Sequence, residues 1–200
     1  FEKSLNDTIS LIGSYTYQDR VLLVKLGFDS IQKNYKIEEI KEWISEGLIN
    51  NYGTSELLEY PFSKRASVCY EELCNGKMIF RSLSDIKHDD ISILNARNIK
   101  SFLLVPIIID KELWGFINLD NCRYEYDWNS AEKAVLENIA ASIGSAIARK
   151  YSNDSLKKSE KMYQELSTLF RLMSDTMPDM IWAKNLKKEY IFVNKAVCKN

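Results

Sequence analysis

Two apolar stretches separated by a two-residue polar turn form the clearest pattern in this chain. Phe102 to Ile109 is almost continuously apolar, which is typical of a strand that is buried on both faces. Asp110-Lys111 breaks the run, and Leu113 to Asp120 then alternates between two kinds of side chain. Together the two stretches predict an antiparallel hairpin at the centre of a sheet.

The second strand of this hairpin divides its side chains into two sets. One set is aliphatic and contains a glycine: Leu113, Gly115, Ile117 and Leu119. The other set mixes aromatic and polar side chains: Trp114, Phe116, Asn118 and Asp120. The first set suits close packing of a helix, and the second can line a pocket. A change of one residue in register would exchange the two sets.

The pattern before the hairpin predicts several shorter elements, of which five are the clearest. These are helices over Leu5 to Thr16 and Ala66 to Cys74, and strands over Val21 to Val24, Ile40 to Leu48 and Met78 to Leu83. Their order indicates an α+β domain with a mainly antiparallel sheet.

A long helix is predicted after the hairpin, from Trp128-Asn129 or Ser130 onward. Its first apolar stripe is Leu136, Ile139, Ala140, Ile143 and Ile147. The stripe lapses and resumes about one residue out of step, at Met162, Leu166, Leu169 and Met173. The helix therefore either adjusts locally, as coiled coils do, or has a hinge near Asn153-Asp154. The second stripe has no domain of its own to pack against, so we expect it to pair with the same helix of a second subunit, in parallel.

The last part of the chain predicts the opening of another domain. Pro178 ends the helix, and two short strands follow at Ile181 to Ala183 and Tyr190 to Val193. The residues from Pro178 to Asn200 are too few for an independent core. Since the chain also starts at Phe1 instead of a methionine, we expect it to be a piece of a longer protein.

Composition narrows the possible functions. The formal net charge of −1 gives no positive excess to attract nucleic acid or an anionic membrane. No apolar run approaches the roughly 20 residues of a transmembrane helix, and no signal peptide opens the chain. The four cysteines have no paired CxxC spacing, which indicates reduced, buried thiols in a cytoplasmic protein and no metal site.

Several motifs occur together in the order typical of one family. They are Asp19-Arg20-Val21, W-I-S-E-G at Trp43 to Gly47, S-F-L-L-V-P-I at Ser101 to Ile107, W-G-F-I-N-L-D-N-C at Trp114 to Cys122, and W-x-x-A-E at Trp128 to Glu132. With them, the chain resembles a GAF domain over about residues 5–150. The tail M-P-D-M-I-W-A-K-N-L-K-K-E-Y-I-F-V-N-K-A, Met177 to Ala196, resembles the opening of a PAS domain.

The resemblance implies a six-stranded antiparallel sheet with helices on both faces and a long C-terminal signalling helix. The first and last helices would lie on one side, and the connecting helices would close a small-molecule cavity on the other. The side chains expected at that cavity are Trp43, Trp114, Phe116, Asn118 and Asp120. The implied domains are a GAF sensor domain at 1–150, a coiled-coil-like helical linker at 151–177 and the truncated start of a PAS domain at 178–200.

This arrangement resembles the sensory half of a bacterial or archaeal signalling protein, most often a two-component histidine kinase. It implies a non-catalytic module that binds a small molecule and relays its occupancy to downstream PAS and kinase domains. The module is expected to be a homodimer formed through the N- and C-terminal helices. The residues assigned to the dimerising and signalling helix are Leu136, Ile139, Ile143, Ile147, Met162, Leu166, Leu169 and Met173.

Three other interpretations stay open. His88, the sole histidine, falls between the third and fourth predicted strands. This position resembles that of the histidine that is the axial haem ligand in some haem-binding GAF sensors. Its context, I-K-H-D-D-I, also fits a solvated loop. A thiol-based reductase of free methionine sulfoxide would use thiols such as Cys69 in S-V-C-Y. A dimerisation spacer without a ligand is the structural alternative. No catalytic constellation is present in the sequence, and the ligand is not identified by it.

Overall fold

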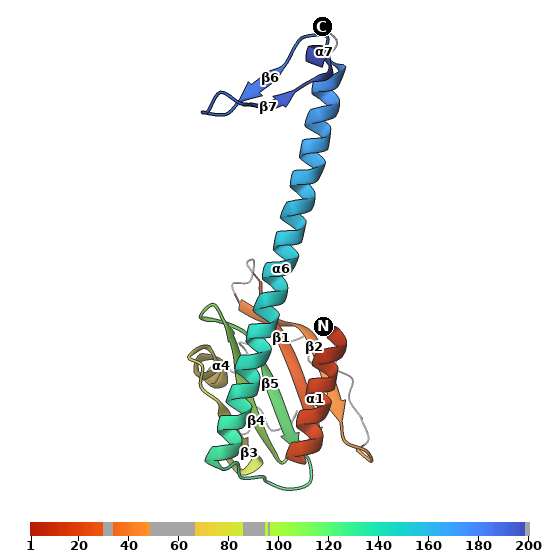
Figure 1. The fold of residues 1–200 in the computed structure, drawn as a ribbon. Coiled ribbons are helices and arrows are strands. Elements are labelled where there is room, and N and C mark those ends of the chain that lie inside the picture. Colours follow the sequence, from red (N-terminus) through yellow and green to blue (C-terminus); the bar gives the residue numbers. More distant parts are fainter. Residues whose placement is uncertain (30–33, 49–66, 86–94, 96, 199–200) are drawn as a thin grey trace. The chain divides into compact units, whose positions relative to one another are not determined.

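The structure of the protein is a computed structural model that describes residues 1–29, 34–48, 67–85, 95 and 97–198 (Figure 1). The chain divides into two compact units, Phe1–Ala148 and Arg149–Asn200. One helix, α6, runs without interruption from Ser130 to Thr176 and contributes to both units. The alternative of a hinge near Asn153-Asp154 therefore has no counterpart in the helix as described.

The first unit is built on an antiparallel sheet with strand order β2-β1-β5-β4-β3. Its strands are β1 (Arg20–Asp29), β2 (Asn34–Ile44), β3 (Ile79–Ser82), β4 (Ser101–Ile109) and β5 (Glu112–Asn121). Within the described ranges the sheet thus has five strands instead of the six that the resemblance implies. β2 ends at Ile44, before the predicted limit of Leu48, and Gly47 in the turn that follows adopts a φ of 86°.

The predicted central hairpin is confirmed, and its turn is tight. Asp110 and Lys111 have φ values of 51° and 70°, as the two central residues of a type I′ turn require. The pairing that follows is irregular on the β5 side. Ile108 pairs with Leu113 and Ile107 with Gly115, so Trp114 is the additional residue of a β-bulge.

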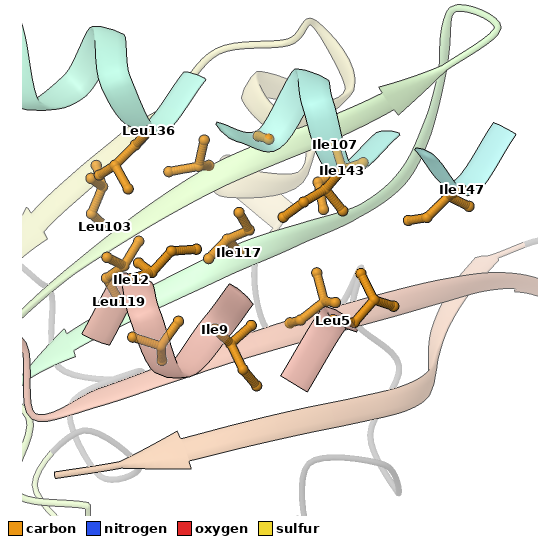
Figure 2. Packing of buried hydrophobic residues seen from close by; sticks show 14 of the residues in the cluster. Leu5, Ile9, Ile12, Leu103, Ile107, Ile117, Leu119, Leu136, Ile143 and Ile147 are labelled. Atoms are coloured by element: carbon orange, nitrogen blue, oxygen red, sulfur yellow. The ribbon is translucent and has the colours of Figure 1, made fainter. Parts of the chain in front are cut away.

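Two helices cover one face of this sheet, which we call the α1/α6 face (Figures 1 and 2). α1 (Glu2–Thr16) includes the helix predicted over Leu5 to Thr16 and contributes Leu5, Ile9 and Ile12. The first part of α6 contributes Leu136, Ala140, Ile143 and Ile147. Between the helices and the sheet these side chains meet the buried strand residues Val21, Leu23, Leu103, Val105, Ile107, Ile117 and Leu119.

The opposite face, the α4 face, is covered by α4 (Ser67–Cys74) through Leu73, whose side chain is fully buried. The strand residues in this second cluster are Leu22, Val24, Leu26, Ile79, Leu104, Leu113 and Phe116. The expectation of helices on both faces is confirmed. β5 supplies buried side chains to both clusters, so it separates the two sides of the domain.

β1 and β5 approach closely at Gly115. A Cβ atom on this residue would lie 2.1 Å from the backbone oxygen of Val24 on β1. Only glycine therefore permits the observed pairing of these strands.

A capping box fixes the start of α6. The backbone N–H of Glu132 donates to Asn129 Oδ1 at 2.9 Å, and the backbone N–H of Asn129 donates to Glu132 Oε2 at 3.0 Å. The helix start near Trp128-Asn129 is thus confirmed. Within the described residues, no helix combines the length and apolarity that a membrane span needs.

The second unit contains the rest of α6 and a small hairpin. Its other elements are β6 (Trp182–Lys184), β7 (Tyr190–Val193) and the short helix α7 (Lys195–Cys198). Asn194 ties them together: its Nδ2 donates to the backbone oxygens of Ser174 and Asp179, both at 2.8 Å, and its Oδ1 accepts from the N–H of Ile181 at 3.0 Å. Asn194 is 1% exposed.

Candidate functional site

Two side chains expected at the cavity, Trp43 and Trp114, lie on the α1/α6 face. The interpretation that placed Trp114 beside Phe116 is wrong, because the bulge at Trp114 shifts the alternation of β5 by one residue. Leu113, expected on the aliphatic side, accordingly packs in the cluster of the α4 face.

Trp43 has a packing role that accounts for its position. Its register partner on β1 is Val21, a core residue of the α1/α6 face. A Cβ atom at Gly13 of α1 would lie 2.1 Å from the Trp43 ring, so the indole lies directly against the helix backbone. Trp43 therefore joins β2 to α1 and does not line the α4 face.

Phe116, Asn118 and Asp120 lie on the α4 face, beyond the bulge, where regular alternation holds. Phe116 belongs to the buried cluster of that face. Asn118 pairs with Leu22 and Leu104, which are members of the same cluster. Asn118 Nδ2 donates to Asp120 Oδ1 at 2.9 Å, as two residues on one face of a strand can.

Arg20 and Glu42 complete this group, which we call the polar centre: Arg20, Glu42, Asn118 and Asp120. Arg20 pairs with Asp120 across β1 and β5, and the Arg20 Nη1 atom lies 3.7 Å from Asp120 Oδ2. Arg20 Nε lies 3.3 Å from Glu42 Oε1 on β2. Arg20 is 4% exposed and Asp120 1%. The roles of Arg20 and Glu42 were not predicted from the sequence, because only the register of three adjacent strands brings both side chains to this face.

Burial dominates the protonation of Asp120. It raises the pKa of this carboxyl to about 6, against the opposing effects of the Arg20 charge, the Asn118 hydrogen bond and the Arg97 charge. Asp120 thus changes charge close to physiological pH. Asp120 Oδ1 accepts a hydrogen bond from Asn118, whereas Asp120 Oδ2 has only the ion-pair contact with Arg20.

Four atoms of the polar centre are buried without a hydrogen-bond partner. They are Arg20 Nε, Arg20 Nη1, Asn118 Oδ1 and Asp120 Oδ2. Arg20 lies close enough to Glu42 and to Asp120 for ion pairs, but neither contact has the geometry of a hydrogen bond. A buried polar atom with no partner at all costs about 1–3 kcal/mol, and here the charges of Glu42 and Asp120 lie close to the Arg20 atoms. Two donors and two acceptors at one place therefore form a candidate binding site.

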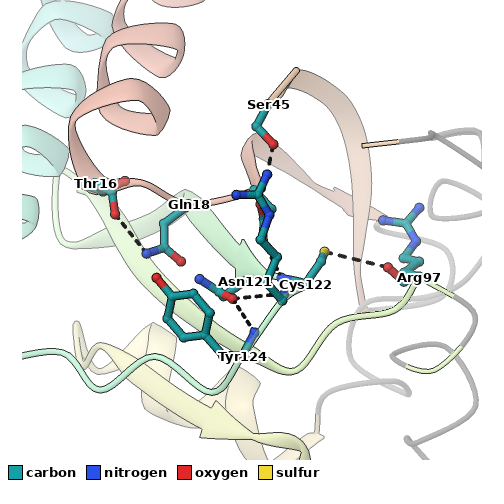
Figure 3. A network of polar contacts seen from close by, with 9 residues as sticks. Thr16, Gln18, Ser45, Arg97, Asn121, Cys122 and Tyr124 are labelled. Carbon is teal, nitrogen blue, oxygen red and sulfur yellow. Dashed lines mark hydrogen bonds and ion pairs between the residues drawn. The ribbon is translucent and has the colours of Figure 1, made fainter. Parts of the chain in front are cut away.

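A second polar network, at the strand ends, is structural (Figure 3). Asp19 Oδ2 accepts from the backbone N–H of Cys122 at 2.8 Å, and Asp19 Oδ1 lies 3.0 Å from Arg123 Nε. The backbone oxygen of Asp19 accepts from the N–H of Ser45 at 2.9 Å. Asp19 thereby joins the beginning of β1 to the ends of β2 and β5. Asn121 Oδ1 adds bonds from the N–H groups of Arg123 and Tyr124.

The cysteines give little support to thiol chemistry. Burial, followed by the charge of Asp120, raises the pKa of the Cys122 thiol to about 11, which disfavours the reactive thiolate. Cys74 and Cys198 are exposed, so the prediction of buried thiols is wrong for these two. The Cys69 side chain and His88 lie outside the described residues. Among those that are described, no group of three acidic, histidine or cysteine side chains could hold a metal ion.

The two apolar stripes of α6 have different surroundings. Leu136, Ile143 and Ile147 are buried against the sheet, with Ile139 packed at the edge of the same cluster. Met162, Leu166, Leu169 and Met173 are between 54% and 60% exposed in the single chain. The first stripe is thus explained by the core of this domain, and the second is open to a partner.

Comparison with known proteins agrees with this architecture. A family model described as the GAF domain matches residues 1–147. The methanogenesis regulatory histidine kinase FilI of Methanothrix harundinacea is 26% identical over 159 residues, which cover 80% of this chain and 18% of that protein. The chain therefore spans less than a fifth of this curated relative.

Solved structures share the fold at low sequence identity. The blue-light absorbing form of the PixJ GAF domain of Thermosynechococcus elongatus aligns with a TM-score of 0.62 at 17% identity, covering 78% of this chain and 92% of its own. A domain described as part of a two-component sensor histidine kinase protein of Sinorhizobium meliloti aligns with a TM-score of 0.57 at 15% identity, covering 78% and 96%. At these identities the likeness shows the fold alone.

Proposed function

The chain belongs to the GAF domain family, and on that premise we propose that it is a non-catalytic sensory module of a signalling protein. It binds a small molecule at the α4 face and relays its occupancy through α6 to a histidine kinase output. The name of the FilI relative supports that output, and this chain corresponds to a small part of such a protein. One observation carries the proposal. The α4 face of β5 holds Asn118 and Asp120 of the polar centre, and the opposite face of the same strand packs under α1 and α6.

The relay follows from the alternation of β5. Asn118 lies on the α4 face between Ile117 and Leu119, which are fully buried on the α1/α6 face. A ligand that binds Asn118 and shifts it therefore also shifts the peptide bonds that join Asn118 to Ile117 and Leu119. Because the core is closely packed, such a displacement is passed on to α6. The ligand changes the arrangement only if it binds two arrangements with different affinity.

A close helix-to-hairpin contact strengthens this route. A Cβ atom on Gly144 of α6 would lie 3.2 Å from the backbone oxygen of Ile108 and 3.3 Å from Ile107 Cγ2. The backbone of α6 thus lies directly against the end of β4. A shift of the hairpin cannot be absorbed there by a long side chain and moves the helix.

The output end of α6 completes the proposal. Met162, Leu166, Leu169 and Met173 recur at alternating four- and three-residue spacing, which is the pattern of a coiled-coil seam. We assign this seam to the same helix of a second subunit, in parallel, and we assign α1 to the same dimer. Residues 178–200 then begin a PAS domain whose remaining chain covers exposed side chains of the hairpin such as Trp182 and Tyr190.

Oligomeric state tests the relay helix directly. Light scattering after size-exclusion chromatography is expected to give a dimer for the native chain and a monomer for Leu166→Glu, because a carboxylate in the seam is not solvated. Gln164→Glu adds the same charge on the opposite side of the helix, where the side chain is exposed, and remains a dimer. A native chain that stays monomeric at millimolar concentration would contradict the dimeric relay.

The non-catalytic character has its own test. The raised pKa of Cys122 argues against a thiol enzyme that uses this residue. The purified chain, supplied with dithiothreitol and free methionine sulfoxide, is expected to form no methionine. Turnover that disappears on removal of a single cysteine would overturn the sensory assignment in favour of a reductase.

A further inference from the structure

We propose that the polar centre recognises an uncharged ligand with an amide-type group, a carbonyl oxygen beside an N–H, on an apolar body. The inference rests on the proposed function, because it names the class of molecule bound at the same face. Three observations on the described residues carry it: the unpaired buried atoms, the balance of charge and the apolar neighbours.

The unpaired atoms define a complementary pattern. Arg20 Nε and Nη1 make ion pairs but donate no hydrogen bond, and Asn118 Oδ1 and Asp120 Oδ2 accept none. A carbonyl oxygen can accept from Arg20 while a neighbouring N–H donates to Asn118 or Asp120. An amide, lactam or imide presents both kinds of group within one plane. A molecule that offers only acceptors would leave two buried acceptors of the protein without partners.

Charge argues against an anionic ligand. Arg20 is held by Glu42 at 3.3 Å and by Asp120 at 3.7 Å. Arg97 also acts on Asp120 through its charge. When all four groups are ionised, the two positive and two negative charges cancel. A buried anion would therefore meet no net positive charge and would lie close to two carboxylates, which is strongly unfavourable in a desolvated place.

The surroundings of the polar centre are apolar. Leu22 and Leu104 flank Asn118 on the neighbouring strands, and Phe116 precedes it on the same face. Phe116 is 5% exposed and contributes a large aromatic surface. The part of the ligand that continues away from the polar group is consequently expected to be aromatic or aliphatic, as in most small-molecule sites.

Benzamide and benzoate make a matched pair of probes, because they have the same ring and nearly the same shape but differ in charge and in the N–H group. The ¹⁵N-labelled chain of residues 1–200 is titrated with each at pH 7.5, and the side-chain signals of Arg20 Nε and Asn118 Nδ2 are followed. We expect benzamide to shift both signals in a saturable manner. Benzoate is expected to bind at least tenfold more weakly.

Two variants assign the effect to the polar centre. Asn118→Leu removes the amide while keeping a similar volume, and it should weaken the binding of benzamide at least tenfold. Asn138→Leu makes the same exchange at an exposed position of α6 and should leave the titration unchanged. Unchanged circular dichroism of Asn118→Leu shows that the loss is not unfolding, and the Arg20 signal reports the site in that variant.

Each outcome bears on the inference in a defined way. Equal or stronger binding of benzoate overturns the ligand class but retains small-molecule binding at this face. Absence of any saturable shift with both probes overturns the inference. The proposed function is judged separately, by whether the protein purified from cells retains a bound molecule.

Discussion

Titration of Asp120 should make the stability of the protein depend on pH. Comparison with the variant Asp120→Asn measures this dependence. Burial raises the pKa of the Asp120 carboxyl to about 6 from an ordinary value of 3.8. The folded protein therefore binds this proton more tightly than the unfolded chain does. The resulting stabilisation is fully present below pH 3.8 and is lost as the pH rises through about 6. Asn cannot ionise, so the variant lacks this dependence.

The size of the effect follows from the pKa difference of about 2. One pKa unit corresponds to about 1.4 kcal/mol, so ionisation of Asp120 removes about 3 kcal/mol of the free energy of unfolding. Other carboxylates titrate in both proteins and cancel in the comparison. The free energy of unfolding of the native chain, relative to that of Asp120→Asn, should thus fall by about 2–3 kcal/mol between pH 4 and pH 7.5.

Urea denaturation followed by circular dichroism at half-unit steps of pH measures this difference. Asp85→Asn is the control of opposite sign, because the hydroxyl and backbone N–H of Ser82 lower the pKa of Asp85. Its carboxylate stabilises the fold above the ordinary pKa and loses that effect as the pH falls. A native-minus-Asp120→Asn difference that is flat, or that rises with pH, would refute the reasoning that burial outweighs the Arg20 ion pair.

Three further predictions concern single positions. Gly115→Ala should lower the free energy of unfolding by about 3 kcal/mol in urea titrations, because the added Cβ meets the backbone oxygen of Val24; unchanged stability would contradict the tight approach of the two strands. Asn194→Leu removes three hydrogen bonds of a buried side chain and should speed amide hydrogen exchange across β6 and β7 while leaving β4 and β5 protected; equal protection in both proteins would argue against that clasp. Cys122 should be alkylated by iodoacetamide at pH 8 about 100-fold more slowly than an ordinary thiol, with the exposed Cys74 as internal reference; comparable rates would contradict its raised pKa and burial.

Much of the fold could be predicted because it depends on local patterns. The turn at Asp110-Lys111 and the helix over Leu5 to Thr16 are each encoded in a short local pattern, and both are confirmed. The faces of β5 could be predicted only beyond Trp114. The bulge depends on how β4 and β5 pair across the turn, and neither strand carries a local signal for it.

The candidate site was less accessible from the sequence because its members come from three strands. Asn118 and Asp120 were predicted from alternation within one strand. Arg20 and Glu42 join them only through the register of β1 with β5 and of β1 with β2. Trp43 illustrates the converse, since an aromatic side chain in a family motif proved to be the contact between β2 and α1. The role of the exposed stripe of α6 stays a prediction.

Native mass spectrometry of the purified chain tests the central claim most directly, because it reports subunit number and bound molecules together. We predict a dimer of twice 23.2 kDa that carries additional mass from a retained small molecule. Leu166→Glu should yield a monomer that still carries the molecule, and Asn118→Leu a dimer that has lost it. A monomer of the bare polypeptide mass, unaffected by either substitution, would contradict the account of a ligand sensor that signals through a paired helix.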